Sequence, residues 1–263
     1  MIEFREVYKS FDEEEVLKNV SFRIEPGETQ IILGESGSGK STVLKLILGL
    51  IKPDSGQILI EGRDIAPMPE RDLVSVRREI GMVFQEGALF DSLSVRENVG
   101  YRLFEEGQMS ESEIELAVQQ LLGFVGLEEA IDKMPTELSG GMKRRVGIAR
   151  ALVGTPRIIL YDEPTAGLDP ITKRAIVDLM IKLRDMERVT SIFVTHDLHA
   201  ASLIATEYAS TGEDGRVYIG KGGESPRLKG ISFIMLQDAS VCFEGSYHEL
   251  MTSELPYIRT FVS

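Results

Sequence analysis

Residues 31–42 read IILGESGSGKST, three apolar residues that run into a loop rich in glycine and serine. The segment fits the pattern GxxxxGK[ST], with Gly34 and Gly39 at the glycine positions and Lys40 and Ser41 at its end. The apolar run VLKLILGL follows with helical character, so the loop joins an expected strand to an expected helix. This context predicts a phosphate-binding loop.

The residue types of this loop suit a nucleotide. Glycines let the backbone curl so that successive amides point inward, and the following helix adds its positive N-terminal end, so together they hold the β-phosphate. Lys40 reaches the β- and γ-phosphates, and the Ser41 hydroxyl is a Mg²⁺ ligand. The loop residues that we expect to bind ATP are Gly34, Glu35, Ser36, Gly37, Ser38, Gly39, Lys40, Ser41 and Thr42.

Composition limits the classes of function. The 263 residues include 42 acidic and 29 basic ones, for a net charge of -13, which argues against nucleic acid as a partner. Cys242 is the only cysteine, which excludes an internal disulfide and fits a reducing compartment. No stretch approaches 18 apolar residues, and the first residues lack the features of a secretory signal. We expect a cytoplasmic protein whose membrane role comes through a partner.

Short β-rich runs alternate with helical patterns, which predicts an α/β fold with a largely parallel sheet. Several runs are continuously apolar, as strands buried on both faces are. The expected strands are Ile2–Val7, Val20–Ile24, Gln30–Leu33, Gln57–Ile60, Ile80–Phe84, Arg157–Tyr161 and Ser191–Thr195.

Two segments interrupt this alternation. Between the expected strands that end at Phe84 and begin at Arg157, three helical patterns follow one another at 94–105, 110–125 and 139–153, so we place a helical subdomain at 86–156. The remaining parts, 1–85 and 157–263, form the expected core. Residues 209–230 are rich in glycine and charge and predict an exposed surface insertion, with a hairpin at Asp214–Gly215.

Three further segments supply catalytic candidates. The apolar run RIILYD ends at Asp162, a candidate Mg²⁺ ligand, and Glu163 follows as the candidate to orient or deprotonate the attacking water. His196 ends another apolar strand, where a neutral imidazole could bond a γ-phosphate oxygen. Gln85 follows IGMVF, and its amide could reach the metal or the water.

The order of these motifs resembles one family over nearly the whole chain. The phosphate loop, Gln85, LSGGM, LYDEP, AGLDP and THD together resemble the ATP-binding cassette ATPases, the nucleotide-binding subunits of ABC transporters. LSGG is the specific element. The resemblance implies a P-loop core with an N-terminal antiparallel β element and an inserted helical subdomain, and a head-to-tail homodimer with two ATP molecules. Ser139, Gly140 and Gly141 of one copy would then face the γ-phosphate held by the other.

The resemblance also implies roles for single residues. Phe11 falls at the adenine-stacking position, with Tyr8 as the alternative, and Asp169 lies in the loop that couples the two sites of the dimer. Gln85 begins the segment that senses an integral-membrane permease, whose coupling helix would dock on the helical subdomain. Such a subunit is peripheral on the inner face of the cell membrane.

A narrower resemblance concerns the cargo. The stretches GALFDSLSVRENV, LSGGMKRRVGIARAL and DEPTAGLDPIT are similar to ATPase subunits of Mla/Mce-type phospholipid transport systems, whereas amino-acid uptake ATPases more often have Gln at Met142. This implies an Mce-domain lipid-binding protein in the complex. An importer ATPase for polar amino acids or another small solute is the alternative. The chain departs from the common cassette pattern at Thr206-Glu207-Tyr208, where Asp-Arg is usual.

Other classes fit the sequence less well. A soluble ABC-type ATPase of DNA repair or translation predicts a basic face, tandem cassettes or a long coiled coil, which this acidic single cassette lacks. A module that never hydrolyses ATP conflicts with the intact Lys40, Glu163 and His196. The basic run 143–145 occupies successive helical positions, so we expect solvated or salt-bridged side chains that form no single patch.

Overall fold

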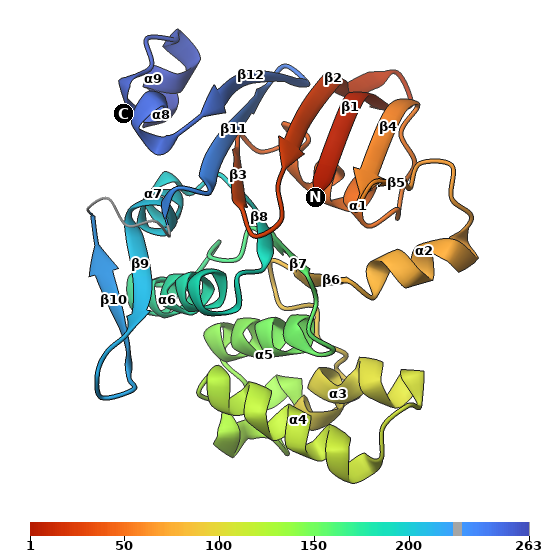
Figure 1. Ribbon diagram of the computed structural model, residues 1–263, viewed down its shortest axis with the longest axis vertical. Helices are drawn as coiled ribbons and strands as arrows, with labels where there is room; N and C mark the ends of the chain where they lie inside the picture. The colour runs from red at the N-terminus through yellow and green to blue at the C-terminus, as the bar shows by residue number, and fades with distance from the viewer. Residues whose placement is uncertain (223–227, 263) are drawn as a thin grey trace.

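The computed structural model describes residues 1–222 and 228–262, and within them six strands form one central sheet (Figure 1). All neighbouring pairs run parallel except the edge pair β11–β12. In spatial order the strands are β12 (Ser240–Gly245), β11 (Ile231–Gln237), β3 (Thr29–Leu33), β8 (Thr190–Thr195), β7 (Ile158–Asp162) and β6 (Ile80–Val83).

The central sheet is buried on both faces, which explains its continuously apolar strands. Ile31 and Leu33 of β3 face one hydrophobic cluster, and Ile32 between them faces the other. The face of Ile32 is covered by an antiparallel sheet and two helices. These elements are β1 (Ile2–Phe11), β2 (Glu14–Ile24), β4 (Ser55–Ile60), β5 (Arg63–Asp64), α1 (Lys40–Ile47) and α2 (Glu70–Arg77).

Helices cover the other face. Between β6 and β7 the chain forms α3 (Val95–Glu106), α4 (Glu111–Phe124), two 3₁₀ turns (Glu128–Ala130 and Pro135–Glu137) and α5 (Gly140–Leu152). Ser94 and Ser110 begin α3 and α4 with capping boxes, in which each serine and the glutamate three residues later bond each other's backbone amides. These helices lie together at one end of the molecule, away from the antiparallel sheet (Figure 1).

The segment after β8 is a correction to the sequence interpretation. Helix α6 (Pro170–Glu187) lies between β7 and β8. After β8 the chain forms α7 (Leu198–Thr206) and the hairpin of β9 (Glu207–Thr211) and β10 (Val217–Lys221), with the predicted turn at Asp214–Gly215. The hairpin starts inside the fold, because Arg174 pairs with the Glu207 carboxylate at 2.6 Å and the Asp185 carboxylate accepts from the Ala209 amide at 2.7 Å. The segment 209–230, predicted as an exposed loop, therefore begins as an anchored hairpin, and its residues 223–227 lie outside the described residues.

The structure confirms the α/β fold with a mostly parallel sheet and the antiparallel N-terminal element. The sequence interpretation missed β11 and β12 and the two short C-terminal helices α8 (Tyr247–Thr252) and α9 (Pro256–Val262). Within the described ranges, no helix has the length and apolarity needed to cross a lipid bilayer.

Candidate active site

The phosphate loop connects β3 to α1 through glycines in conformations that other residues avoid. Gly37 has a φ of 85° and Gly39 a φ of 95°. A Cβ on Gly39 would lie 2.7 Å from the Val16 carbonyl oxygen of β2, so the loop packs closely against the first hairpin. The helix α1 then begins at Lys40, with its N-terminal amides at the loop.

Lys40 is folded back into this loop. Its ammonium donates to the carbonyl oxygens of Gly34 and Glu35, both at 2.8 Å, and lies 3.9 Å from the Glu163 carboxylate. Burial lowers the pKa of Lys40, while the carboxylates of Glu163 and Asp162 act in the opposite direction. A desolvated ammonium of this kind is stabilised by phosphate oxygens.

Two oxygen donors meet beside Lys40. The Ser41 hydroxyl donates to the Asp162 carboxylate over 2.9 Å, although the two residues are 121 positions apart. Burial raises the pKa of Asp162, and the Ser41 hydrogen bond only partly offsets this. The Ser38 hydroxyl oxygen is buried and has no hydrogen-bond partner among the described residues. Hydroxyl and carboxylate oxygens suit Mg²⁺, which takes its other ligands from water and phosphate, so these residues fit Mg²⁺ and a nucleotide.

Glu163 is held from three directions. Its carboxylate accepts from the Thr195 hydroxyl at 3.0 Å and from the His196 amide at 3.4 Å, and the His196 Nδ1 atom lies 2.9 Å away. The backbone of Glu163 has a φ of 45°, a strained value for a side chain of this type. Strand β7 ends here, and β8 beside it supplies Thr195 and leads into His196.

These residues enclose one cavity of about 420 Å³. It is lined by Glu35, Ser36, Gln85, Glu163, His196 and Phe261. The structure therefore brings Gln85, Glu163 and His196 together at the carboxyl ends of the parallel strands, next to the phosphate loop. Ligands of open α/β sheets bind at this edge.

The residues of the LSGG motif, Ser139, Gly140 and Gly141, lie at the start of α5, and we call them the signature residues. Ser139 is the N-cap, and its hydroxyl oxygen accepts from the Met142 amide at 3.3 Å, which leaves the hydroxyl proton available to donate. Gly140 is exposed, and a Cβ there would meet nothing within 4 Å, whereas a Cβ on Gly141 would lie 2.3 Å from the Thr172 methyl group of α6. Gly140 thus has open space toward solvent.

The remaining predicted residues lie outside this cavity's lining. Phe11 ends β1 with 45% of its surface exposed, and the Lys9 ammonium lies 5.3 Å from its ring centre. The hairpin that carries Phe11 touches the phosphate loop through Val16. Asp169 is the N-cap of α6 and accepts from the amides of Ile171 and Thr172 at 3.1 Å.

The expectation for the basic run was wrong at Arg144. This side chain is buried, and its guanidinium donates to the Gln85 carbonyl oxygen at 2.5 Å and to that of Ala166. Arg145 is partly exposed and donates to the carbonyl oxygens of Val125 and Gly126, just after α4, and it has no salt-bridge partner among the described residues. Arg144 therefore joins the signature helix to the Gln85 segment and to the loop after Glu163. The run of three adjacent basic residues does not indicate that the Arg144 side chain points into the protein.

Sequence reasoning also missed contributions from two other places. Thr195 precedes His196 in the THD motif, but only the folded structure shows that its hydroxyl orients Glu163. Phe261 of α9 lines the cavity together with Glu35 and Ser36 of the phosphate loop. The sequence of a seven-residue C-terminal helix does not indicate that the helix packs beside a loop more than 200 positions earlier.

Three features meet at one edge of the sheet: a phosphate loop, a hydroxyl and carboxylate pair suited to Mg²⁺, and the Glu163 carboxylate held by Thr195 and His196. Together they define the class of P-loop nucleotide hydrolases. The chain matches the ABC transporter family over residues 17–166, and it belongs to that family. Its site accordingly binds ATP with Mg²⁺ and is that of an ABC ATPase.

Individual relatives agree with this assignment. The chain is 41% identical to the Arabidopsis thaliana protein TRIGALACTOSYLDIACYLGLYCEROL 3, chloroplastic, across 100% of its own length and 73% of that protein's. It is 42% identical to the methionine import ATP-binding protein MetN of Corynebacterium jeikeium (82% of this chain, 61% of the relative). It is 40% identical to the probable ribonucleotide transport ATP-binding protein mkl of Mycobacterium leprae (77% and 58%). The chain thus spans less than two thirds of the last two.

Solved structures show the same architecture. The dimeric post-hydrolysis state of the ATP-binding cassette MJ0796 bound to ADP and Pi superimposes with a TM-score of 0.77 at 34% identity, covering 94% of this chain and 98% of that one. The structure of cbiO1 from Clostridium perfringens, part of the transporter complex cbiONQ, gives 0.78 at 28% identity, covering 99% and 98%.

Proposed function

We propose that this chain is the ATP-hydrolysing subunit of an ABC transporter of the Mla/Mce type, which moves phospholipid or another lipid through a partner permease. The observation that favours a lipid cargo is the match to the Arabidopsis relative, because the name of that protein is built on the chemical name of a galactolipid. That match includes the whole chain, while the methionine and ribonucleotide relatives match about four fifths of it. Met142 and the segment GALFDSLSVRENV point the same way.

In this proposal each catalytic side chain has one task. ATP supplies the γ-phosphoryl group, and Mg²⁺ offsets its charge. Lys40 and the amides at the start of α1 hold phosphate oxygens, and Ser41 and Asp162 hold the metal. Glu163, with its carboxylate fixed by Thr195 and His196, orients a water and takes its proton.

Two copies are required in this proposal. Gly140 and Ser139 are exposed at the start of α5, and neither residue lines the cavity around Glu163. A head-to-tail homodimer lets the signature of one copy reach the phosphate held by the other. The dimeric MJ0796 structure, similar over nearly this whole chain, supports this arrangement.

The permease would dock on the helical subdomain, which we place at 86–156. Four aromatic side chains of this region are exposed, Phe90, Tyr101, Phe104 and Phe124. The rings of Phe90 and Tyr101 lie 4.7 Å apart, and the Arg150 guanidinium lies 5.8 Å from the Phe90 ring. Such a patch directly after Gln85 suits an amphipathic coupling helix, and exposed aromatic groups of this kind mark interaction sites. The subunit would then sit at the inner membrane face, beside an Mce-domain lipid-binding protein.

The catalytic part is tested with Glu163→Gln. The amide keeps the size of the side chain but cannot accept a proton, so phosphate release should fall by a factor of about 10²–10⁴ while ATP still binds. The variant should accumulate as an ATP-bound dimer, measured by size-exclusion chromatography with light scattering. Glu213→Gln at the exposed hairpin tip is the charge-matched control. A native rate in Glu163→Gln would show that the base is elsewhere.

The cargo is tested on the complex that the chain forms with its permease, reconstituted in proteoliposomes. ATP-dependent transfer of a fluorescent phospholipid and uptake of radiolabelled methionine are measured in parallel, with Glu163→Gln as the inactive control. We expect lipid transfer alone. Methionine uptake without lipid transfer would favour the importer alternative instead.

A further inference from the structure

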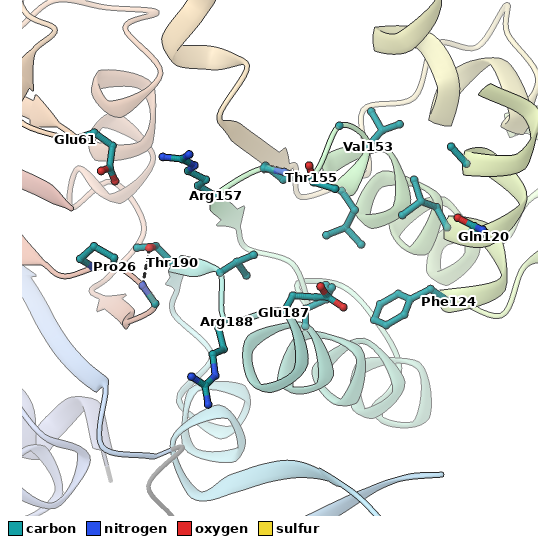
Figure 2. Close-up of a pocket in the computed structure, with 18 residues that line it drawn as sticks. Pro26, Glu61, Gln120, Phe124, Val153, Thr155, Arg157, Glu187, Arg188 and Thr190 are labelled. Carbon is teal, nitrogen blue, oxygen red and sulfur yellow. Dashed lines mark hydrogen bonds between the residues drawn. The ribbon is translucent and has the colours of Figure 1, made fainter. Parts of the chain in front are cut away.

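A second, larger cavity lies at the opposite edge of the central sheet (Figure 2). It has a volume of about 640 Å³, within the range of about 300–1,000 Å³ that is typical of small-molecule sites. Arg157 and Thr190, which line it, stand at the amino ends of β7 and β8, whereas Asp162 and Thr195 stand at the carboxyl ends of the same strands. The two cavities are therefore separated by the length of the sheet.

One side of this cavity is apolar. Ala117, Leu121 and Phe124 are spaced by four and three residues on α4, so they share one helix face that lines the space. Leu152 at the end of α5 and Leu183 of α6 complete this side. Phe124 remains 38% exposed, so the face that it shares is only partly covered within the protomer. An apolar ligand group would gain by covering it.

The other side carries an incompletely paired cation. Figure 2 shows Arg157 and Glu61 on the side away from Phe124 and Gln120. The Arg157 guanidinium reaches only 3.9 Å from Glu79, which is also 3.4 Å from Arg63. Glu61 is already paired with the Met1 amino group at 2.6 Å. Positive charge therefore exceeds negative charge at this end.

Two more charges complete the lining. Arg188 has no ion-pair partner within the described chain, which adds to the positive surplus. Glu187 is exposed and lies on the side of Phe124 in Figure 2. A carboxylate there disfavours an anionic group on the apolar side and so favours one orientation of a ligand with a single charged end.

We propose that this cavity binds a single-chain amphiphile, with its apolar tail along α4 and its anionic head, a carboxylate or a phosphate, at Arg157. The tail covers the apolar face of α4, and the head completes the ion pairing of Arg157. Neither step uses the ATP site or depends on transport, so failure of the proposed transport function leaves this inference standing.

The test uses calorimetric titration of the full chain with four ten-carbon probes below their micelle concentrations. These are decanoate, decyl phosphate, decanol and decylammonium. We expect one decanoate or decyl phosphate per protomer, and about tenfold weaker binding of decanol because it lacks the ion pair. The tighter of the two anions identifies the head group. Decylammonium should bind more weakly still.

Three variants locate the binding. Arg157→Gln should reduce decanoate affinity about tenfold, to the level of decanol. Ala117→Met fills part of the apolar side and should weaken all four probes. Arg71→Gln, at a guanidinium that is 85% exposed outside the cavity, should change nothing. The proposal is overturned if decylammonium binds as tightly as decanoate, if Arg157→Gln or Ala117→Met binds like the native chain, or if no probe saturates.

Discussion

The substitution Gly140→Ala separates a role across a dimer from a role within the protomer. Gly140 is the first residue of α5, is exposed, and has no atom within 4 Å of the position a Cβ would take. In a helix alanine is favoured over glycine, so the protomer should gain up to about 1 kcal/mol. For a chain of this size that corresponds to a rise in melting temperature of about 2–4 °C at most.

The same methyl group should damage hydrolysis. If Ser139 and Gly140 meet the phosphate of a partner, a Cβ on Gly140 holds that phosphate away from the amides and lengthens their hydrogen bonds. Loss of one such donor costs a factor of about 10²–10³ in rate, so we expect phosphate release to fall at least tenfold while ATP binding to each protomer persists. The assay is steady-state phosphate release, with melting temperature measured on the same preparations.

Gly141→Ala provides the matched comparison. Its Cβ would lie 2.3 Å from the Thr172 methyl group, so the protomer itself should lose about 1–3 kcal/mol. The double variant with Thr172→Ser removes that methyl group and should recover the stability. The reasoning is refuted if Gly140→Ala hydrolyses ATP at the native rate, or if it lowers the melting temperature as Gly141→Ala does.

Three other predictions follow from the site. Burial raises the pKa of Asp162 in the folded state, so the ionised carboxylate destabilises the nucleotide-free protein at neutral pH. The variant Asp162→Asn should therefore have a higher melting temperature than the native chain at pH 7.5, and the difference should disappear near pH 4, where the carboxyl is protonated in both states. The same variant should abolish Mg²⁺-dependent hydrolysis. Arg144→Met removes two hydrogen bonds from a buried guanidinium and should cost about 2 kcal/mol or more in urea unfolding, with a lower kcat. Phe11→Ala should raise the KM for ATP about tenfold through lost base stacking, and Tyr8→Ala should leave it nearly unchanged; the reverse result would make Tyr8 the stacking residue.

The sequence predicted those parts of the site that depend on local pattern. Lys40 and Ser41 follow from a motif of consecutive residues, and Asp162 and Glu163 from the end of an apolar strand. Because the carboxyl ends of parallel strands meet at one edge, the closeness of Ser41 and Asp162 could be expected from topology before the 2.9 Å contact was measured.

What sequence could not supply is the direction of side chains whose partners are distant along the chain. Arg144 looks like any charged residue of an exposed helix, yet it is buried because the carbonyl groups of Gln85 and Ala166 need a donor. Strand β11 was missed although its run ISFIMLQ is apolar, because it follows a glycine-rich segment that was interpreted as an insertion. In both cases tertiary contacts determined the outcome.

Two helices run from the predicted dimer-contact residues Ser139 and Asp169 to the larger cavity. Helix α5 begins at the signature with Ser139 as its cap and ends at Leu152, which lines the larger cavity. Helix α6 begins with Asp169 as its cap and ends at Glu187, which lines it as well. With 13 and 18 residues they span about 20 and 27 Å, so a displacement at one end of either rigid rod is carried to the other. An amphiphile that shifts these helix ends would change the closure of the ATP-bound dimer, and by linkage ATP would change the amphiphile's affinity by the same factor.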